Sequence, residues 1–322
     1  MSKLSITLLP SDLSWNGWDR LLGPVLKTLI MHSSADGLKE WAGTSEARDL
    51  LKRMADRGVE VEYVMHICSE ILPRKLFGKH PELFRMNEQW QRVPDANLCP
   101  SNPAVEAVLA RHLRPYFDAL RPTTGRYHLG PDDNRPWCFC RQCRMLTWSD
   151  QNLLFANMLA RILRRWDRRA KVAYIAYKPA IEPPVAVKPE KNVFLLFAPI
   201  ERDYRHALAE ERTAKDAYYR RSAEELLAYF GRKDSTLIEY WLDVSMFSRW
   251  MAPRQKVPVP AKVMRADLAY YRSAGFDLIA TFGAWLDQAY VQEFGDGPVQ
   301  DFVKSWQEIN RPQKGPSKAK RR

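Results

Sequence analysis

The segment SEARDLLKRMADRGVEVEYVMH, from Ser45 to His66, contains one complete helix-to-strand unit and decides the fold. Its first part, Ser45 to Arg57, has the apolar spacing of an amphipathic helix. Its last part, Val59 to His66, is a short β-rich apolar run. Gly58 stands between the two, where a left-handed helix cap is expected. Repetition of such units along a chain indicates a parallel β-sheet covered by helices.

The unit recurs over the whole chain. We predict eight strands, at Ile6 to Leu9, Lys27 to His32, Val59 to His66, Arg126 to Gly130, Lys171 to Tyr177, Asn192 to Ala198, Thr236 to Leu242 and Asp277 to Phe282. The predicted helices are Ser45 to Arg57, Pro103 to Leu120, Ser149 to Arg168, Asp216 to Phe230, Pro260 to Ala274 and Val299 to Ile309. Eight strands alternating with helices predict an α/β fold, the (β/α)8 TIM barrel.

Loop lengths in this barrel differ between its two faces. The third (His66 to Asn102), fourth (Asp132 to Trp148), sixth (Pro199 to Lys215) and seventh (Asp243 to Pro258) loops after a strand are long, whereas the connections from helix to strand are short. Enlarged loops at the C-terminal strand ends mark the functional face of a barrel. The fifth crossover, Lys178 to Lys191, holds four prolines and is predicted to be irregular.

The net charge of +12 is concentrated at one end of the chain. Residues 311–322, RPQKGPSKAKRR, carry six Lys or Arg and no acid, which leaves +6 for residues 1–310. We predict a single barrel over 1–310 and a basic disordered tail over 311–322, so a nucleic-acid partner is not favoured. The chain has neither an apolar run long enough to span a bilayer nor a secretory signal pattern, so we expect a cytoplasmic protein, although exported relatives are conceivable.

Carboxylates follow several predicted strands. Asp132 and Asp133 come after the fourth strand, Glu201 after the sixth, and Asp243 ends the seventh. Hydrolysis of a glycosidic bond needs one acid to protonate the leaving oxygen and a second group to attack or stabilise the anomeric carbon. We therefore predict a glycoside hydrolase with Asp132, Asp133 and Glu201 as catalytic residues.

Aromatic rings and histidines near the same strand ends favour a carbohydrate ligand, because flat rings stack on the apolar faces of sugars. The sequence holds 11 Trp, several of them near the predicted mouth of the barrel. The predicted substrate-binding residues are His32, His66, Trp137, Tyr177, Trp241, Asp243 and Trp285. Each Trp could equally pack in the core.

Four of the five cysteines fall in the third and fourth loops. Cys138, Cys140 and Cys143 form a C-x-C-x-x-C motif, and Cys99 lies in the third loop. Thiolates in this number can hold a structural zinc ion, which is our predicted metal site. Free thiols, or disulfides in an exported relative, are the alternatives. No cofactor is expected to be required for catalysis.

Several segments together resemble one family. They are HPELF at His80 to Phe84, LCPSNPAV at Leu98 to Val105, D-x4-C-x-C-x-x-C at Asp133 to Cys143, APIERDYRHAL at Ala198 to Leu208, EYWLDVSMFSRW at Glu239 to Trp250, and VPVPAKVMRADLAYYRSAGFDLIATFG at Val257 to Gly283. Through them the chain resembles the domain of unknown function 4838 family. That family is similar to glycoside hydrolase family 163 endo-β-N-acetylglucosaminidases and, more distantly, to family 67 α-glucuronidases.

The resemblance implies a glycosidase barrel acting on an oligosaccharide or glycan, with a substrate-assisted mechanism in which the N-acetyl group of the sugar is the nucleophile. One of Asp132 and Asp133 would then polarise the acetamido group, and the other, or Glu201, would protonate the leaving oxygen. Two alternatives stay open: an α-glucuronidase-like hydrolase, and a catalytically inactive barrel that binds carbohydrate.

Overall fold

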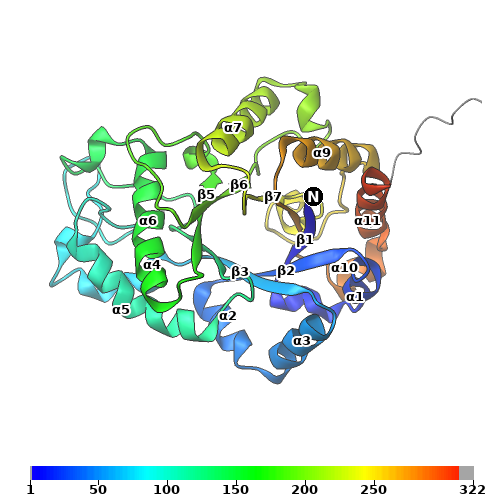
Figure 1. The fold of residues 1–322 in the computed structure, drawn as a ribbon, viewed down its shortest axis with the longest axis horizontal. Coiled ribbons are helices and arrows are strands. Elements are labelled where there is room, and N and C mark those ends of the chain that lie inside the picture. The colour runs from blue at the N-terminus through cyan, green and yellow to red at the C-terminus, as the bar shows by residue number, and fades with distance from the viewer. Residues whose placement is uncertain (1, 312–322) are drawn as a thin grey trace, which may run out of the picture.

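Eight parallel strands close into a barrel in the computed structural model, which describes residues 2–311 (Figure 1). Each strand pairs with its neighbours in chain order, and β1 pairs with β8 to complete the ring. The strands are β1 (Lys3–Leu8), β2 (Leu26–His32), β3 (Glu60–His66), β4 (Arg126–Gly130), β5 (Lys171–Tyr177), β6 (Val193–Ala198), β7 (Thr236–Glu239) and β8 (Leu278–Phe282). The predicted TIM barrel is confirmed.

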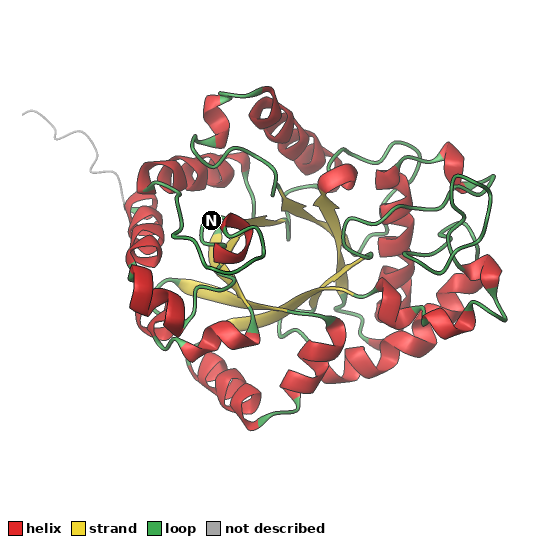
Figure 2. Cartoon of the chain, turned by 180° about the vertical axis from the view of Figure 1, so that it is seen from behind, coloured by secondary structure: helices red, strands yellow, loops and turns green. Residues whose placement is uncertain are grey.

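Long helices surround the barrel on its outside (Figures 1 and 2), and short helices lie in its loops. They are α1 (Gly17–Leu22), α2 (Ala35–Ala42), α3 (Ser45–Asp56), α4 (Cys68–Ile71), α5 (Ala104–Ala119), α6 (Trp148–Trp166), α7 (Ala214–Phe230), α8 (Val244–Phe247), α9 (Ala261–Ala274), α10 (Gln288–Phe294) and α11 (Gly297–Asn310). All six predicted helices are present, with ends shifted by at most three residues. The short helices α1, α2, α4, α8 and α10 were not predicted, because so few turns give little periodic signal.

Two glycines make the tight change from helix to strand. Gly58 and Gly275 follow α3 and α9 with φ of 65° and 98°, the left-handed region that other residues adopt at a cost. Both positions were expected from the sequence. They set the direction in which β3 and β8 enter the barrel wall.

The fifth crossover has no α-helix between β5 and β6, as predicted, and side chains of α6 supply its missing hydrogen bonds. Asp150 is the third residue of α6 and forms a capping box with Thr147, and its Oδ1 atom accepts the backbone N–H groups of Val185, Ala186 and Val187 at 2.8–3.0 Å. Asn157 accepts from the N–H of Glu190 at 2.8 Å. Polar groups of the preceding helix therefore fix an irregular segment that four prolines keep from coiling.

A charged cluster fills part of the barrel interior. Glu62 on β3 accepts from Arg126 at 2.5 Å and lies 2.6 Å from His128 Nε2, and all three side chains are buried. Burial alone would raise the pKa of Glu62, but His128 and Arg126 lower it below its ordinary value. His128 is thus a buried histidine of the barrel wall with Glu62 as its partner.

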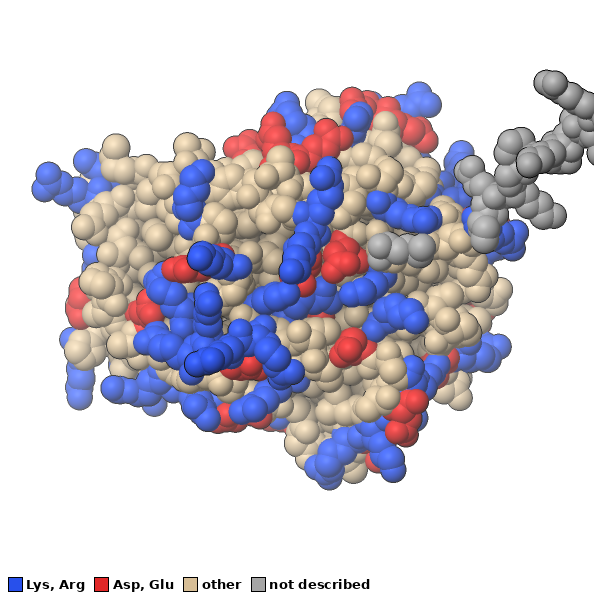
Figure 3. Space-filling view, viewed as in Figure 1, with Lys and Arg blue, Asp and Glu red and all other residues tan. Residues whose placement is uncertain are grey.

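The surface in the view of Figure 3 carries Lys and Arg with Asp and Glu interspersed, densest toward the lower left. The predicted basic tail lies outside the described residues apart from Arg311. No helix among residues 2–311 is long and apolar enough to cross a membrane.

Candidate active site

A cavity of about 550 Å³ opens at the C-terminal ends of the strands, and we call it the mouth cavity. Its volume lies within the usual range for small-molecule sites. The apolar lining comes from strands such as β5, β6 and β7. The polar and aromatic lining consists of His32, His66, Asp133, Tyr177, Lys178, Tyr240, Asp243, Ser245, Trp250, Phe282 and Trp285.

Asp133 enters the mouth cavity from the loop after β4 and is about half exposed. Its Oδ1 atom lies 3.8 Å from Nε2 of His66, the last residue of β3. His66 Nδ1 donates to the carbonyl of Pro131 at 2.6 Å, which leaves Nε2 directed at the carboxylate. A Cβ atom on Gly130 would lie 3.1 Å from His66 Nδ1, so glycine at the end of β4 makes room for this ring.

Asp243 is the second carboxylate of the mouth cavity among the described residues, and it differs from Asp133 in its burial. It caps α8, and its Oδ1 atom accepts from Ser245 Oγ at 2.5 Å and from the N–H of Met246 at 3.0 Å. Burial raises the pKa of Asp243 above its ordinary value, although these two hydrogen bonds lower it. The mouth cavity therefore holds one solvated and one buried acid.

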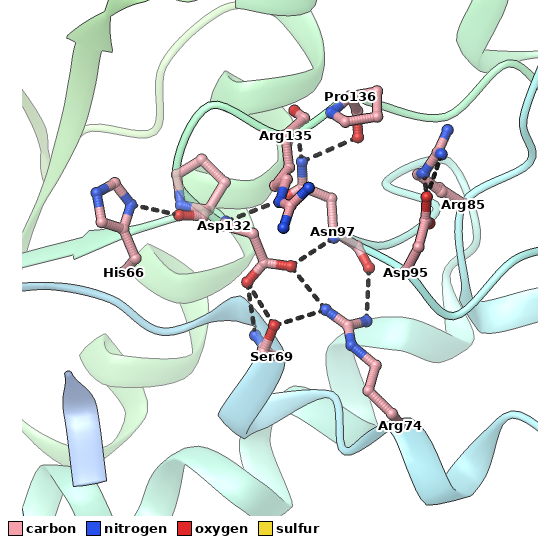
Figure 4. A network of polar contacts seen from close by, with 10 residues as sticks. His66, Ser69, Arg74, Arg85, Asp95, Asn97, Asp132, Arg135 and Pro136 are labelled. Atoms are coloured by element: carbon pink, nitrogen blue, oxygen red, sulfur yellow. Dashed lines mark hydrogen bonds and ion pairs between the residues drawn. The ribbon is translucent and has the colours of Figure 1, made fainter. Parts of the chain in front are cut away.

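Asp132 lies next to Asp133 in sequence but does not line the mouth cavity. Figure 4 shows its carboxylate between the third and fourth loops. Oδ1 accepts from the N–H and hydroxyl of Ser69 at 2.9 and 2.7 Å, and Oδ2 accepts from Arg74 and from the N–H of Asn97, both at 2.6 Å. Four donors occupy this carboxylate, so it joins the two loops and holds the backbone on which Asp133 stands.

Glu201 also lies outside the lining of the mouth cavity. Its side chain is about half exposed, 3.4 Å from Lys215 Nζ. Among the three predicted catalytic acids, the structure therefore brings only Asp133 into the mouth cavity and places Asp243 there instead of the other two.

The predicted substrate-binding rings divide into two groups. Tyr177 and Trp285 line the mouth cavity. Trp241 is fully buried and donates to Asp267 at 3.0 Å, and Trp137 is buried beside a separate pocket of about 30 Å³. These positions correct the prediction that Trp137 and Trp241 contact a substrate in the mouth cavity. Both rings pack in the core, a role that their sequence positions also allowed.

The remaining predicted residue, His32 at the end of β2, lines the mouth cavity and its Nδ1 atom lies 2.9 Å from the carbonyl of Val64. Burial lowers the pKa of His32 to about 4, so the ring is neutral near pH 7. Its edge meets Phe282 at 5.1 Å between ring centres. Because Nδ1 donates to the Val64 carbonyl, Nε2 of the neutral ring is left to accept a hydrogen bond.

Tyr240, Phe282, Trp250 and Lys178 were not among the predicted binding residues but line the mouth cavity. Tyr240 and Phe282 stack with ring centres 5.1 Å apart. Ile238 and Tyr240 both line the cavity, so the period-2 alternation around β7 could have revealed Tyr240. Nothing in the sequence distinguishes Lys178, which follows the end of β5.

Asp12, in the loop after β1, is a buried acid behind the mouth cavity. Its two carboxylate oxygens accept the N–H groups of Leu9 at 2.8 Å and Trp285 at 3.0 Å, and both of these residues line the cavity. Burial raises the pKa of Asp12 to about 7, and this effect outweighs the two hydrogen bonds, which lower the pKa. The carboxyl thus connects the loops after β1 and β8.

This raised pKa predicts a pH-dependent stability. The folded protein holds the Asp12 proton up to about pH 7, whereas the unfolded chain releases it near 3.8. The stabilisation is complete below the unfolded value and is lost as the pH rises through about 7. Relative to Asp12→Asn, which stays neutral, the wild type should lose up to about 1.4 kcal/mol of unfolding free energy per pH unit between about pH 5 and pH 7. Urea unfolding of both proteins across this range measures the difference, and parallel curves would contradict it.

Two further features of the site concern the cysteines. Cys99, Cys138, Cys140 and Cys143 are buried, and their Sγ atoms lie within 4.8 Å of one another. The structure therefore brings together all four predicted metal ligands, three of them from the loop that carries Asp133.

Comparison with known families agrees with this barrel. The family model described as "Domain of unknown function (DUF4838)" matches residues 36–279. The chain therefore belongs to the DUF4838 family. No sequence among functionally curated proteins matches this DUF4838 chain.

Solved structures show what the DUF4838 barrel is similar to. A β-galactosidase from Rahnella sp. R3 superposes with a TM-score of 0.54 at 11% identity, over 96% of this chain and 56% of that protein. A GH42 β-galactosidase from G. stearothermophilus, solved as a catalytic mutant, superposes with a TM-score of 0.52 at 13% identity, over 96% of this chain and 58% of that protein. The chain spans just over half the length of these enzymes. The likeness shows that this chain shares its barrel fold with these enzymes.

Proposed function

We propose that this DUF4838 protein is a glycoside hydrolase acting on an oligosaccharide or glycan. The observation that carries the proposal is the pair Asp133 and Asp243, which reach one mouth cavity from the loops after β4 and β7. One acid is solvated and the other buried. Glycoside hydrolysis uses two carboxyl groups in unlike environments, because one must hold a proton that the other has released.

We assign the roles from these two environments. Asp243, whose pKa burial raises, is the proton donor: its proton passes to the glycosidic oxygen as the bond from that oxygen to the anomeric carbon breaks. Asp133 is the partner carboxylate that faces the developing positive charge, and its Oδ1 atom lies 3.8 Å from His66 Nε2. No described residue donates to Asp243 Oδ2, so this oxygen is the one available to a substrate.

Aromatic rings supply the sugar-binding surface of the mouth cavity. Trp250 is largely exposed and Trp285 partly so, and both have left-handed backbones with φ of 56° and 65°. A bulky residue adopts this conformation at a cost of about 1–3 kcal/mol, and such residues gather at functional sites. We interpret the two rings as platforms for sugar rings at the entrance.

Two substrate classes follow from the family resemblance, and each would use this site differently. With a β-N-acetylglucosaminide, the acetamido oxygen of the substrate would attack the anomeric carbon and Asp133 would orient that group. With an α-glucuronide, a cation would be needed for the sugar carboxylate. Among residues 2–311, Lys178 is the only Lys or Arg that lines the mouth cavity, so it would bind the sugar carboxylate.

A panel of aryl glycosides and glycans tests the proposal. It should include β-N-acetylglucosaminides, α-glucuronides and β-galactosides, with N-glycans as natural substrates. Turnover of an N-acetyl sugar, with inhibition by a thiazoline analogue of the cyclised intermediate, would establish the substrate-assisted route. Absence of turnover throughout, together with sugar binding that is unchanged in Asp133→Asn, would identify a non-catalytic carbohydrate-binding barrel instead.

Asp243→Asn tests the assignment of the proton donor. Asparagine keeps an oxygen for Ser245 and Met246 and is a good helix cap, so the fold should be retained. We expect kcat/KM for a natural glycoside to fall by about 100- to 10,000-fold. For an aryl glycoside whose leaving group needs no proton, the loss should be much smaller. Equal losses on both substrates would contradict the donor role.

A further inference from the structure

We infer that Cys99, Cys138, Cys140 and Cys143 form a structural zinc site that joins the third and fourth loops. Cys99 lies in the loop after β3, and the other three lie in the loop after β4. The four side chains form a buried cluster of their own, separate from the main hydrophobic core, with Met86 packed against it. This inference is independent of the proposed hydrolase activity.

Distances between the sulfur atoms fit a tetrahedral ion. Cys99 Sγ lies 3.7 Å from Cys140 Sγ and 3.9 Å from Cys143 Sγ. Zinc–sulfur bonds of about 2.3 Å in a tetrahedron place neighbouring sulfurs about 3.8 Å apart. A disulfide needs about 2.05 Å, and all four cysteines are free thiols. The spacing is that of four ligands around one centre, not of two bonded pairs.

Groups around the cluster suit thiolates. The N–H groups of Met86 and Cys140 donate to Cys138 Sγ at 3.3 and 3.4 Å. Arg92 Nη1 lies 3.8 Å from the same sulfur, and Ser101 Oγ lies 3.0 Å from Cys143 Sγ. Four thiolates with Zn²⁺ carry a net charge of −2, which the Arg92 guanidinium partly offsets. Four sulfur ligands with no open position are typical of structural zinc.

The site has a clear structural task. The loop after β3 runs from His66 to α5 and contains only single-turn helices. One end of the segment Asp132 to Cys143 is bound to that loop by the Asp132–Asn97 hydrogen bonds, at 2.6 and 2.9 Å. The zinc ion would bind the other end through Cys99. The two attachments hold the segment Asp132 to Cys143, which carries Asp133. Loss of the metal should therefore loosen the site without removing any group from the mouth cavity.

Metal analysis of the purified full-length protein is the direct test. We expect one zinc per chain, retained in Cys68→Ser, whose buried cysteine lies outside the cluster. Zinc should be lost from Cys99→Ser and Cys138→Ser, with a fall in Tm on the order of 10 °C. Iron in place of zinc, or a metal-free wild type, would overturn the assignment, as would full zinc retention in both cluster variants.

A second measurement covers the case in which the cluster variants fail to fold. Titration of wild-type thiols with a mercurial should release the zinc as four thiols react. Replacement by Co²⁺ should give the intense thiolate-to-cobalt absorption of a tetrahedral sulfur site. Zinc that is released without reaction of the thiols, or a cobalt protein without this absorption, would place any metal elsewhere and overturn the inference.

Discussion

Asp133→Asn is expected to lower kcat for glycoside hydrolysis by about 100- to 10,000-fold with little change in KM. Asparagine has nearly the same shape but no charge, and the removed charge is the one that we propose faces the anomeric carbon in the transition state. The substitution leaves the Asp132 network untouched, because that network uses a different side chain. Steady-state kinetics on the substrate identified by the panel measures the effect.

Two further variants make this result specific. Glu210→Gln removes an exposed acid of the sixth loop that pairs with Arg212, and its activity should match the wild type. Glu201→Gln tests the acid predicted from sequence to act after the sixth strand, and we expect a small effect because Glu201 lies outside the mouth cavity. An active Asp133→Asn together with an inactive Glu201→Gln would reverse the roles assigned here.

Arg202→Met is expected to lower the free energy of unfolding by about 3–5 kcal/mol. Arg202 is fully buried and pairs with Glu239, at 2.9 Å from Nε to Oε1, and with Asp267. Methionine fills similar space without the charge, so two buried carboxylates would lose their counter-charge. Burial already raises the pKa of Asp267 to about 6, although Arg202 lowers it. Without Arg202 one of the acids should take up a proton on folding.

Urea unfolding at neutral pH measures this loss. Arg205→Met is the matched control, because Arg205 lies three residues along the same loop and is itself largely exposed in its pair with Asp203. Its removal should change stability by less than about 1 kcal/mol. Restoration of most of the lost stability in the triple variant Arg202→Met, Glu239→Gln, Asp267→Asn would support the reason given. A single Arg202→Met variant as stable as Arg205→Met would refute it.

The position of an acid after a predicted strand identifies some residues of the candidate site but not all of them. Asp133 and Asp243 were both placed near the mouth because each follows a predicted strand, and the structure brings both into one cavity. Asp132 is the neighbour of Asp133 and follows the same strand, yet its side chain faces the third loop. Its partners Ser69, Arg74 and Asn97 lie roughly 35 to 63 residues away in the chain, so no local pattern identifies them.

The sequence also leaves open which tryptophans are buried in the core. Trp241 is the second residue after β7, and the sequence alone allows it to face either the mouth or the helices. The structure buries it against Phe302 of α11 and bonds it to Asp267 of α9. The burial of a large ring depends on which distant helices cover it, which a single strand does not encode.

The sequence by itself determined the eight strands, the long helices, the glycines that end α3 and α9, and the set of four loop cysteines, because each of these depends on local periodicity or on residue chemistry. Only the tertiary structure decided which acids share the mouth cavity, that Asp12 is buried behind it, and that Cys99 reaches the other three sulfurs. These depend on loop conformations fixed by contacts between residues far apart in the chain. The fourth loop, which carries Asp132, Asp133 and three of the cysteines, shows both: its residue types are evident from the sequence, and the directions of its side chains only from the tertiary structure.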